Sequence, residues 1–309
     1  MTQQIQEVHA SPRVRAESTR AHIPCNLCGS TASTPFCPEN GKGLVKCSAC
    51  GLVFVSPRPD AQELYALYGE TYFHNDDSGT VGYTNYLKDE RNIRQTFQRR
   101  LKRLEKFIQP GKVLDVGCAL GFFLAEAKNR GWQVQGLDIS HFAVDYAQKT
   151  FQFDARQGSL LEADFPTEAY DLVTMWDVIE HVPDPKAYIQ ACADRLHSGG
   201  VIALATPDVA SIPAKVTGKR WVGYKLSEEH LYYFSPETLS KMLNDAGFDV
   251  VDVYHVGKYV TLSLFLNRLG MYTPLLAKMG QAIERIFKLS EKSLYVNPFD
   301  IVAVTARKR

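Results

Sequence analysis

The chain has 309 residues, 45% of them hydrophobic and 22% charged, and its formal net charge is +1. This is an ordinary globular composition, and the length is sufficient for one large domain and one small one. A net charge close to zero gives the protein no overall attraction to nucleic acid. No apolar run reaches the ~18 residues that a membrane span needs. We therefore expect no nucleic-acid partner and no membrane span.

Polar residues dominate positions 1–22. This segment lacks the apolar core of a signal peptide, so we expect a disordered leader and a cytoplasmic protein. In that compartment cysteines bind metals more often than they form disulfides.

Two short units of identical spacing, CNLCG and CSACG, follow the leader. Their cysteines are Cys25, Cys28, Cys47 and Cys50. A glycine after each second cysteine allows the left-handed backbone of a metal-binding turn, and two facing turns form a closed tetrahedral site of four sulfurs. This pattern predicts a zinc-ribbon unit over residues 23–58 with a structural Zn²⁺. Iron in a rubredoxin-like site is the alternative, because the same geometry suits both metals.

Residues 59–110 are predicted to form a helical connector that serves as a cofactor lid. Apolar residues near its end recur at helical spacing: Ile93, Phe97, Leu101, Leu104 and Ile108. Basic residues crowd the other surface: Arg91, Arg94, Arg99, Arg100, Lys102, Arg103 and Lys106. Such a face can bind phosphate groups, but with a neutral total charge we expect a solvated exterior.

Seven strand candidates follow, several of them runs of Val, Ile and Leu that are typical of strands covered on both faces. They are residues 112–117, 133–138, 153–157, 171–176, 201–206, 248–254 and 300–306. Helical stretches separate the first five, which predicts a Rossmann-like α/β domain over residues 111–309 with a doubly wound, seven-stranded sheet. Within it we expect segment 207–236 to cover the acceptor pocket. Segment 257–297 is predicted to be a helical insertion that covers a sheet face or forms a homodimer.

The first of these strands runs into a glycine-bearing turn, in the stretch VLDVGCALGFF. Gly117 permits close approach of a ligand to the backbone, and a helix that starts near Gly121 offers free N–H donors. Asp138 ends the second strand, where a carboxylate can accept hydrogen bonds from both hydroxyls of a ribose. The alternative is that Asp115, Asp138 and Asp177 are only helix caps.

This arrangement resembles class I S-adenosylmethionine-dependent methyltransferases. Their first motif, D-x-G-x-G-x-G, is matched by Asp115, Gly117 and Gly121, with Ala119 in place of the middle glycine. The resemblance implies further cofactor-binding residues along the sheet. These are Cys118 in the turn, Asp138 at the ribose, Ile139 beside the adenine, Ser159 and Leu160 at the adenine edge, and Trp176 and Asp177 near the cofactor.

Two histidines are candidates for a catalytic base, which methyl transfer needs only when the acceptor must lose a proton. His181 follows the fourth strand at the carboxyl end, where ligands bind in such sheets, and His230 lies in SEEHLYYFS of the cover segment. Histidine titrates near the working pH, which suits a base. The alternative is structural: His181 is hydrogen-bonded within the fold, and His230 fixes the cover segment.

The resemblance extends to bacterial sugar and natural-product methyltransferases with an amino-terminal CxxCG unit, and SEEHLYYFS resembles quinone O-methyltransferases. It implies methyl transfer from S-adenosyl-L-methionine to a small molecule of saccharide or natural-product kind, with O-methylation favoured over C- or N-methylation. Two other functions stay open. One is a nucleotide-sensing binding protein that docks through its ribbon, and the other is an aminopropyl transferase.

Overall fold

The computed structural model describes residues 22–37, 43–58, 86–225, 229–270 and 292–309, with Thr273, Leu275, Lys278 and 280–282 between the last two ranges. The predicted leader, apart from its last residue, and much of the predicted connector lie outside the described residues. In the described part of the chain, no helix combines the length and the apolarity that a bilayer crossing requires.

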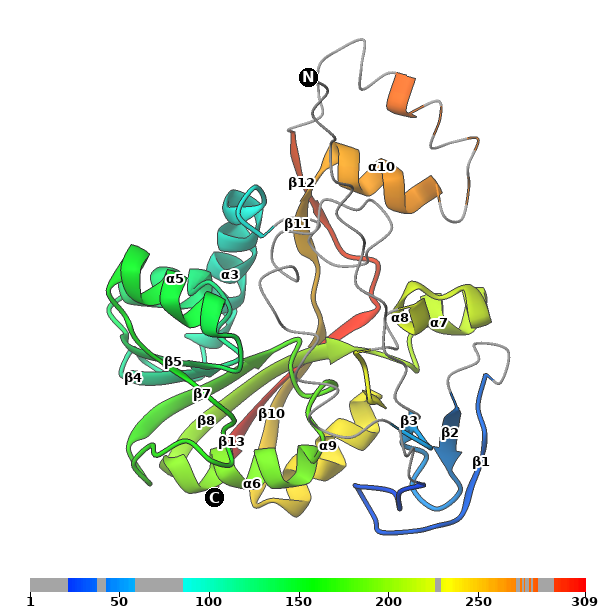
Figure 1. The fold of residues 1–309 in the computed structure, drawn as a ribbon, viewed down its shortest axis with the longest axis horizontal. Coiled ribbons are helices and arrows are strands. Elements are labelled where there is room, and N and C mark those ends of the chain that lie inside the picture. Colours follow the sequence, from blue (N-terminus) through cyan, green and yellow to red (C-terminus); the bar gives the residue numbers. More distant parts are fainter. Residues whose placement is uncertain are drawn as a thin grey trace, which may run out of the picture.

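A seven-stranded sheet forms the centre of the molecule (Figure 1). In spatial order its strands are β10 (Phe248–His255), β13 (Ile301–Lys308), β8 (Leu196–Pro207), β7 (Tyr170–Trp176), β4 (Lys112–Val116), β5 (Gln133–Asp138) and β6 (Asp154–Gln157). Within this sheet β13 runs antiparallel to both neighbours, and the other strands run parallel to one another. The strand order reverses at β4, which places a ligand-binding crevice at the carboxyl ends there. The predicted Rossmann-like α/β fold is confirmed.

Helices cover both faces of this sheet (Figure 1). One face carries α3 (Glu90–Leu104), α4 (Phe122–Asn129) and α5 (His141–Phe151), and the other carries α6 (Pro185–Arg195) and α9 (Pro236–Asp245). Neighbouring residues of β7 show the division, because Leu172 shares a core with Phe123 of α4 and Val173 shares one with Ile189 of α6. A strand buried on both faces requires apolar residues in succession.

Helix α3 buries the apolar face that its periodicity predicted, including Ile93, Leu101 and Leu104. Arg100 is buried as well, with 4% of its surface exposed, so the prediction of a solvated basic face is wrong for this residue. Its guanidinium lies 4.9 Å from the ring centre of Trp176, and the contact with this aromatic ring holds it between helix and sheet.

The amino-terminal cysteine unit contributes β1 (Ser33–Pro35), β2 (Leu44–Cys47) and β3 (Val53–Val55) to a second sheet. Its fourth strand, β9 (Tyr232–Tyr233), comes from the predicted cover segment, and Phe54 of β3 pairs with Tyr232. The same cover segment also contains α7 (Ile212–Thr217), the 3₁₀-helix η3 (Gly218–Arg220) and α8 (Val222–Lys225). The cysteine unit and the larger domain therefore share a sheet.

The predicted helical insertion 257–297 is helical only in part. Helix α10 (Leu262–Gly270) agrees with the prediction, but β11 (Lys258–Thr261) and β12 (Ser293–Val296) pair antiparallel at its two ends. The helical prediction is wrong there because aromatic and β-branched residues favour extended backbone. Tyr259 and Tyr295 face each other across this hairpin with ring centres 5.3 Å apart.

Candidate active site

The turn after β4 requires glycine at position 117. Gly117 has φ +76°, and a Cβ there would lie 2.4 Å from Cγ2 of Val178, so a larger residue would have to displace its neighbour. Ala119 also adopts the left-handed region, with φ +46°, where the family motif has glycine. The turn leads into α4, whose first N–H groups have no acceptor within the helix. These amides can donate to a polar or anionic ligand.

Asp138 connects this turn to the end of β5. Its Oδ2 accepts a hydrogen bond from the Ala119 amide at 2.8 Å, and its Oδ1 accepts one from the Ser140 amide at 2.9 Å. Each carboxylate oxygen keeps a lone pair for a ligand hydroxyl. Burial raises the pKa of this carboxyl above its usual range.

The helix-cap alternative is wrong for the three acids. The N-caps of α4, α5 and α6 are Gly121, Ser140 and Asp184, not Asp115, Asp138 or Asp177.

The residues predicted at the adenine edge are turned into the protein. The hydroxyl of Ser159 lies 2.8 Å from that of Tyr188 and accepts a hydrogen bond from the Leu161 amide at 3.3 Å. Leu160 is fully buried, whereas Ile139 is half-buried beside Asp138. Because the Ser159 side chain is engaged by the fold, a polar contact to adenine from this turn would come from its backbone.

A pocket opens between the turn and α3. Its lining includes Asp115, Gly117, Cys118, Ala119, Trp176 and Asp177 of the predicted cofactor residues, together with Ile93, Phe97 and Arg100 of α3 and Lys258 of β11. The other predicted residues do not line it: Gly121, Asp138, Ile139, Ser159 and Leu160. These five lie at the end of the turn and at the carboxyl ends of β5 and β6.

Two acids of this pocket differ in charge. Asp115 accepts a hydrogen bond from the Thr174 hydroxyl at 2.6 Å, and burial raises its pKa to about 8. Burial also acts to raise the pKa of Asp177, but the positive charges of Lys258 and Arg100 hold it below its usual range. The distances to Oδ2 of Asp177 are 3.0 Å from Lys258 Nζ and 3.9 Å from Arg100 Nη2. At neutral pH the pocket therefore holds one protonated acid and one ion-paired carboxylate.

Glu180, His181 and His230 form a second polar cluster, with ligand-type atoms within 4.8 Å of one another. The two imidazole rings meet edge to face at 4.5 Å between centres, and Nδ1 of His181 lies 3.1 Å from the Glu229 carbonyl oxygen. Burial lowers the pKa of His181 to about 4. Burial and the negative charge of Asp177 raise the pKa of Glu180 to about 8. His181 is thus a neutral imidazole at neutral pH. Two imidazoles and a carboxyl could also hold a divalent cation.

The two histidines are brought together, but neither lines the pocket at the cofactor turn. Among described residues, that pocket reaches the end of β7 through Trp176 and Asp177. The sequence placed His181 near the acceptor because it follows the fourth strand, and His230 because it lies in the predicted cover segment. Their pairing across 49 residues of sequence has no local signature.

Sequence reasoning also missed a histidine–carboxylate pair at the same edge. Nε2 of His255 lies 2.9 Å from Oδ2 of Asp208, which is 3% exposed. Both residues stand at the carboxyl end of a strand, because His255 ends β10 and Asp208 directly follows β8. That position is the sequence signal that could have identified the pair. Arg100 and Lys258 were missed as pocket residues, because nothing local distinguishes them from solvated basic residues.

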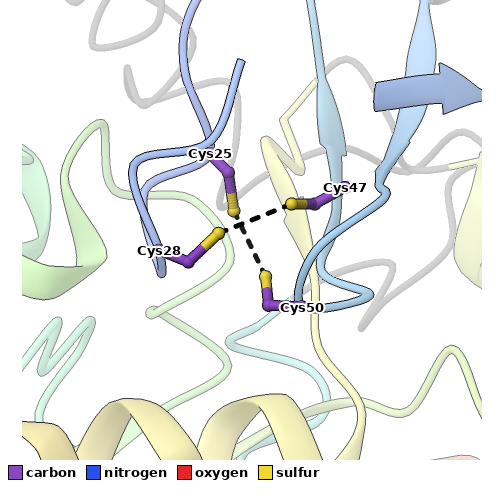
Figure 2. A group of neighbouring side chains, drawn as sticks. All are labelled: Cys25, Cys28, Cys47 and Cys50. Carbon is purple, nitrogen blue, oxygen red and sulfur yellow. Dashed lines mark hydrogen bonds between the residues drawn. The ribbon is translucent and has the colours of Figure 1, made fainter. Parts of the chain in front are cut away.

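The four cysteine side chains of the amino-terminal unit point toward one another (Figure 2). The sulfurs of Cys25 and Cys50 are 3.4 Å apart, those of Cys28 and Cys47 are 3.5 Å apart, and all four lie within 4.8 Å. A disulfide would need ~2.0 Å. A tetrahedral site with metal–sulfur bonds of ~2.3 Å places its sulfurs ~3.8 Å apart. The residues therefore fit a metal ion.

The backbone of this unit favours a thiolate at Cys47, whereas burial raises the pKa of Cys25 and Cys50. Gly29 and Gly51 adopt φ +76° and +79°, which confirms the predicted left-handed turns. Burial acts to raise the pKa of Cys47, but the backbone amides of Cys50 and Ala49 lower it to about 7. A thiolate, not a thiol, is the species that binds a metal.

A family profile described as "Methyltransferase domain" matches residues 88–253, which is more than half of the chain. The chain belongs to this methyltransferase family. The matched region runs from α3 to β10 and contains the glycine turn, Asp138 and the two clustered histidines. The prediction of a methyltransferase domain is confirmed.

Curated relatives of this methyltransferase include enzymes named ubiquinone biosynthesis O-methyltransferase. The Leptothrix cholodnii protein is 30% identical over 152 residues, covering 45% of the chain and 64% of the relative. The Xanthomonas axonopodis protein is 32% identical over 167 residues, covering 50% of the chain and 70% of the relative. The chain thus spans less than two thirds of the Leptothrix protein.

The fold recurs in a crystal structure described as a SAM-dependent methyltransferase from Archaeoglobus fulgidus. The two share 20% identity with a TM-score of 0.51, over 74% of the chain and 100% of that protein. At this identity the likeness shows a common fold.

Proposed function

We propose that this protein binds S-adenosylmethionine at the turn between β4 and α4 and transfers its methyl group to an oxygen of a small molecule. The observation that carries the proposal is the turn of Gly117 and Ala119, fastened to the carboxylate of Asp138 within a methyltransferase fold. The relatives named as O-methyltransferases support oxygen as the acceptor atom. A saccharide or natural-product acceptor is our proposal from the sequence resemblance.

The residues present fit the cofactor. The free lone pairs of Asp138 would accept the ribose hydroxyls, Ile139 would border the adenine, and the turn and Asp115 would hold the amino-acid end. Trp176 and Phe97 form an aromatic wall beside the turn, and the guanidinium of Arg100 stacks on both rings. When bound, S-adenosylmethionine supplies a methyl group already activated on a sulfonium. Holding the acceptor in line with that methyl group can therefore provide much of the catalysis.

The acceptor hydroxyl must also lose a proton, and we assign that step to the pair of His181 and His230. His181 is unprotonated at physiological pH because burial lowers its pKa to about 4, so a ring nitrogen is available, although the same shift makes the imidazole a weak base. The carbonyl oxygen of Glu229 orients the ring through Nδ1. His230 packs edge-on against it and stands in the segment that continues into β9.

We further propose that the four-cysteine site holds a structural Zn²⁺. Four sulfurs leave no coordination position for a substrate, so the ion would organise the fold. Visible absorption would indicate ferric iron instead, because Zn²⁺ is colourless.

Two measurements test the proposed activity. Calorimetry should detect binding of S-adenosylhomocysteine, and incubation with methyl-labelled S-adenosylmethionine and fractionated cell extract should place the label in a small molecule. Nuclear magnetic resonance of the product should show an O-methyl group. Binding of a dinucleotide without S-adenosylhomocysteine would overturn the proposal. Activity only with the decarboxylated donor and a polyamine would indicate an aminopropyl transferase instead.

A further inference from the structure

A second pocket of about 370 Å³ opens between α3, the end of β10 and the β11–β12 hairpin. This volume is within the range of small-molecule sites. The pocket shares Thr96 and Arg100 with the cofactor pocket, so the two cavities adjoin along α3. His255, at the carboxyl end of β10, also lines it. The second pocket therefore lies at the edge of the sheet where this fold binds its ligands.

The lining of this pocket is strongly basic. Among the residues that the structure describes, twelve line it, of which five are Arg or Lys and none is Asp or Glu: the basic residues are Arg99, Arg100, Lys102, Arg103 and Lys106. Asp252 neutralises Arg103 through two hydrogen bonds of 2.7 and 2.9 Å. The one acid in this stretch of α3 and its following turn, Glu105, pairs with Arg130 instead. In the described part of the chain, Arg99, Lys102 and Lys106 have no acidic partner. Because the whole protein carries only +1, this is a local concentration of charge.

Arg100 gives a second, independent indication of a ligand. It is 4% exposed, and its Nε and Nη2 have no hydrogen-bond partner among the residues that the structure describes. The nearest carboxylate oxygen, on Asp177, is 3.9 Å away, beyond hydrogen-bond distance, and Lys258 contacts that same oxygen at 3.0 Å. Leaving a buried guanidinium with unmet donors is costly, and Nη2 faces Asp177 of the cofactor pocket, so these donors lie in the wall that the two cavities share.

Two tyrosines hold the arginines of the pocket in place. The guanidinium of Arg99 lies 4.2 Å from the ring centre of Tyr295, and that of Arg103 lies 3.6 Å from that of Tyr254. A guanidinium stacked on an aromatic ring keeps its edge free for hydrogen bonds, and of these two only Arg99 has that edge available, because Asp252 occupies the edge of Arg103. Such a fixed fork matches the oxygen atoms of a phosphate group.

We propose that this pocket binds a phosphate or diphosphate group of the methyl acceptor, so that the acceptor is a phosphorylated small molecule. The role as acceptor rests on the proposed function, whereas binding of the anion does not. Several cations without an acidic partner surround this cavity, and their combined charge exceeds the single negative charge of a carboxylate. The cavity therefore favours a multiply charged anion. A ligand anchored here would place the rest of its structure toward the shared wall at Arg100.

Calorimetry on the full chain at low ionic strength tests the inference with pyrophosphate, inorganic phosphate and acetate as separate probes. Pyrophosphate should bind more tightly than acetate, and the affinity should fall as salt is added. The double variant Lys102→Ala/Lys106→Ala removes two exposed side chains, so it should fold normally. It should weaken pyrophosphate binding about 10-fold or more and leave S-adenosylhomocysteine binding unchanged.

A matched double variant, Lys128→Ala/Lys186→Ala, removes the same charge from other exposed positions and should bind pyrophosphate as the natural protein does. Equal losses in both variants, or acetate binding as tightly as pyrophosphate, would overturn the inference. Tighter binding of pyrophosphate than of phosphate would indicate a diphosphate-linked acceptor. If the protein binds S-adenosylhomocysteine but does not bind pyrophosphate, the phosphate site alone is overturned. If it binds pyrophosphate but does not bind S-adenosylhomocysteine, the proposed methyl transfer alone is overturned.

Discussion

At the scale of single residues, one carboxylate links the two halves of the cofactor site. Asp138 ends β5, yet it accepts hydrogen bonds from Ala119 in the neighbouring turn and from Ser140 at the start of α5. The same group thus shapes the turn and, in the proposed function, would offer lone pairs to a ribose. Its position after the second strand is what a local sequence motif can encode.

The substitution Asp138→Ala should weaken S-adenosylhomocysteine binding about 100-fold or more, because two charge-assisted hydrogen bonds of ~1.5 kcal/mol each would be lost. Calorimetry measures this. The control Asp145→Ala removes an exposed acid from α5 and should bind normally, and metal content should be unchanged in both proteins. Unaltered affinity in Asp138→Ala would show that the ribose assignment is wrong.

Glu180 should make the protein less stable at alkaline pH. It is 1% exposed, and both carboxyl oxygens have no hydrogen-bond partner within the described ranges. Because burial raises its folded pKa to about 8 from 4.5, its contribution to stability is complete below pH ~4.5 and is lost as the pH rises through 8. Glu180→Gln cannot ionise, so its free energy of unfolding relative to the natural protein should increase by roughly 1–3 kcal/mol between pH 5.5 and pH 9.

Urea unfolding at the two pH values checks this expectation. Glu162→Gln, at an exposed position, is the matched control and should show no such change. A constant difference between Glu180→Gln and the natural protein across pH would contradict the ionisation argument.

The sequence predicted which residues lie close together where the signal is local. Gly117, Asp138 and the CxxC cysteines all stand at fixed offsets from a strand or a turn, and the structure brings each set together. Arg100 was assigned to a solvated face from helical periodicity. Periodicity alone cannot show that the β11–β12 hairpin, which is distant in sequence, packs against that face. Through this contact, Thr96 accepts a hydrogen bond from the Tyr259 amide at 2.8 Å.

At the scale of elements, the cover segment is held by the cysteine unit. Arg58 donates hydrogen bonds to the Tyr232 hydroxyl at 2.7 Å and to the Pro183 carbonyl oxygen at 2.9 Å. It therefore joins β9 to the loop that carries His181. The seven strands of the central sheet were predicted, several of them from apolar runs, whereas β9 was not, because two residues are too few for a pattern. The hairpin β11–β12 was also missed, since its partners are distant in sequence.

Replacing Arg58 should weaken binding of the acceptor and leave binding of the cofactor unchanged. Arg58→Met should lower the free energy of unfolding by about 1–3 kcal/mol, because the Pro183 carbonyl oxygen would lose a charged donor. We expect a raised KM for the acceptor and an unchanged Kd for S-adenosylhomocysteine. Lys46→Met, at an exposed position on β2, is the control. Equal losses in acceptor and cofactor binding would argue against a role confined to the cover segment.

At the scale of the whole molecule, the four-cysteine unit and the methyltransferase domain form one structure. Cys25, Cys47 and Phe54 belong to the same apolar core as Ile189 of α6 and Leu239 of α9. Asn26 donates a hydrogen bond to Asp184, the N-cap of α6, at 2.8 Å. A change at the sulfurs would therefore reach the acceptor side of the domain through β3 and β9.

Elemental analysis should find one zinc per chain, and Cys47→Ser should lose it because a tetrahedral site needs all four sulfurs. Methylation of the acceptor should fall with the metal, since β9 would lose an ordered partner next to His230, while S-adenosylhomocysteine should still bind. Cys37→Ser, outside the four-sulfur group, should keep its zinc. Unchanged zinc content in Cys47→Ser would reject the proposed cage.

The pairing of β3 with β9 also bears on how this protein could be shortened. A version beginning at α3 would leave the main-chain groups of Tyr232 and Tyr233 without a neighbouring strand and uncover the ring of Tyr232 that Phe54 now stacks against. An open strand edge flanked by aromatic rings recruits other copies, so the trimmed protein should precipitate or self-associate. Strand β3 therefore protects the edge of β9 from pairing with other copies of the protein.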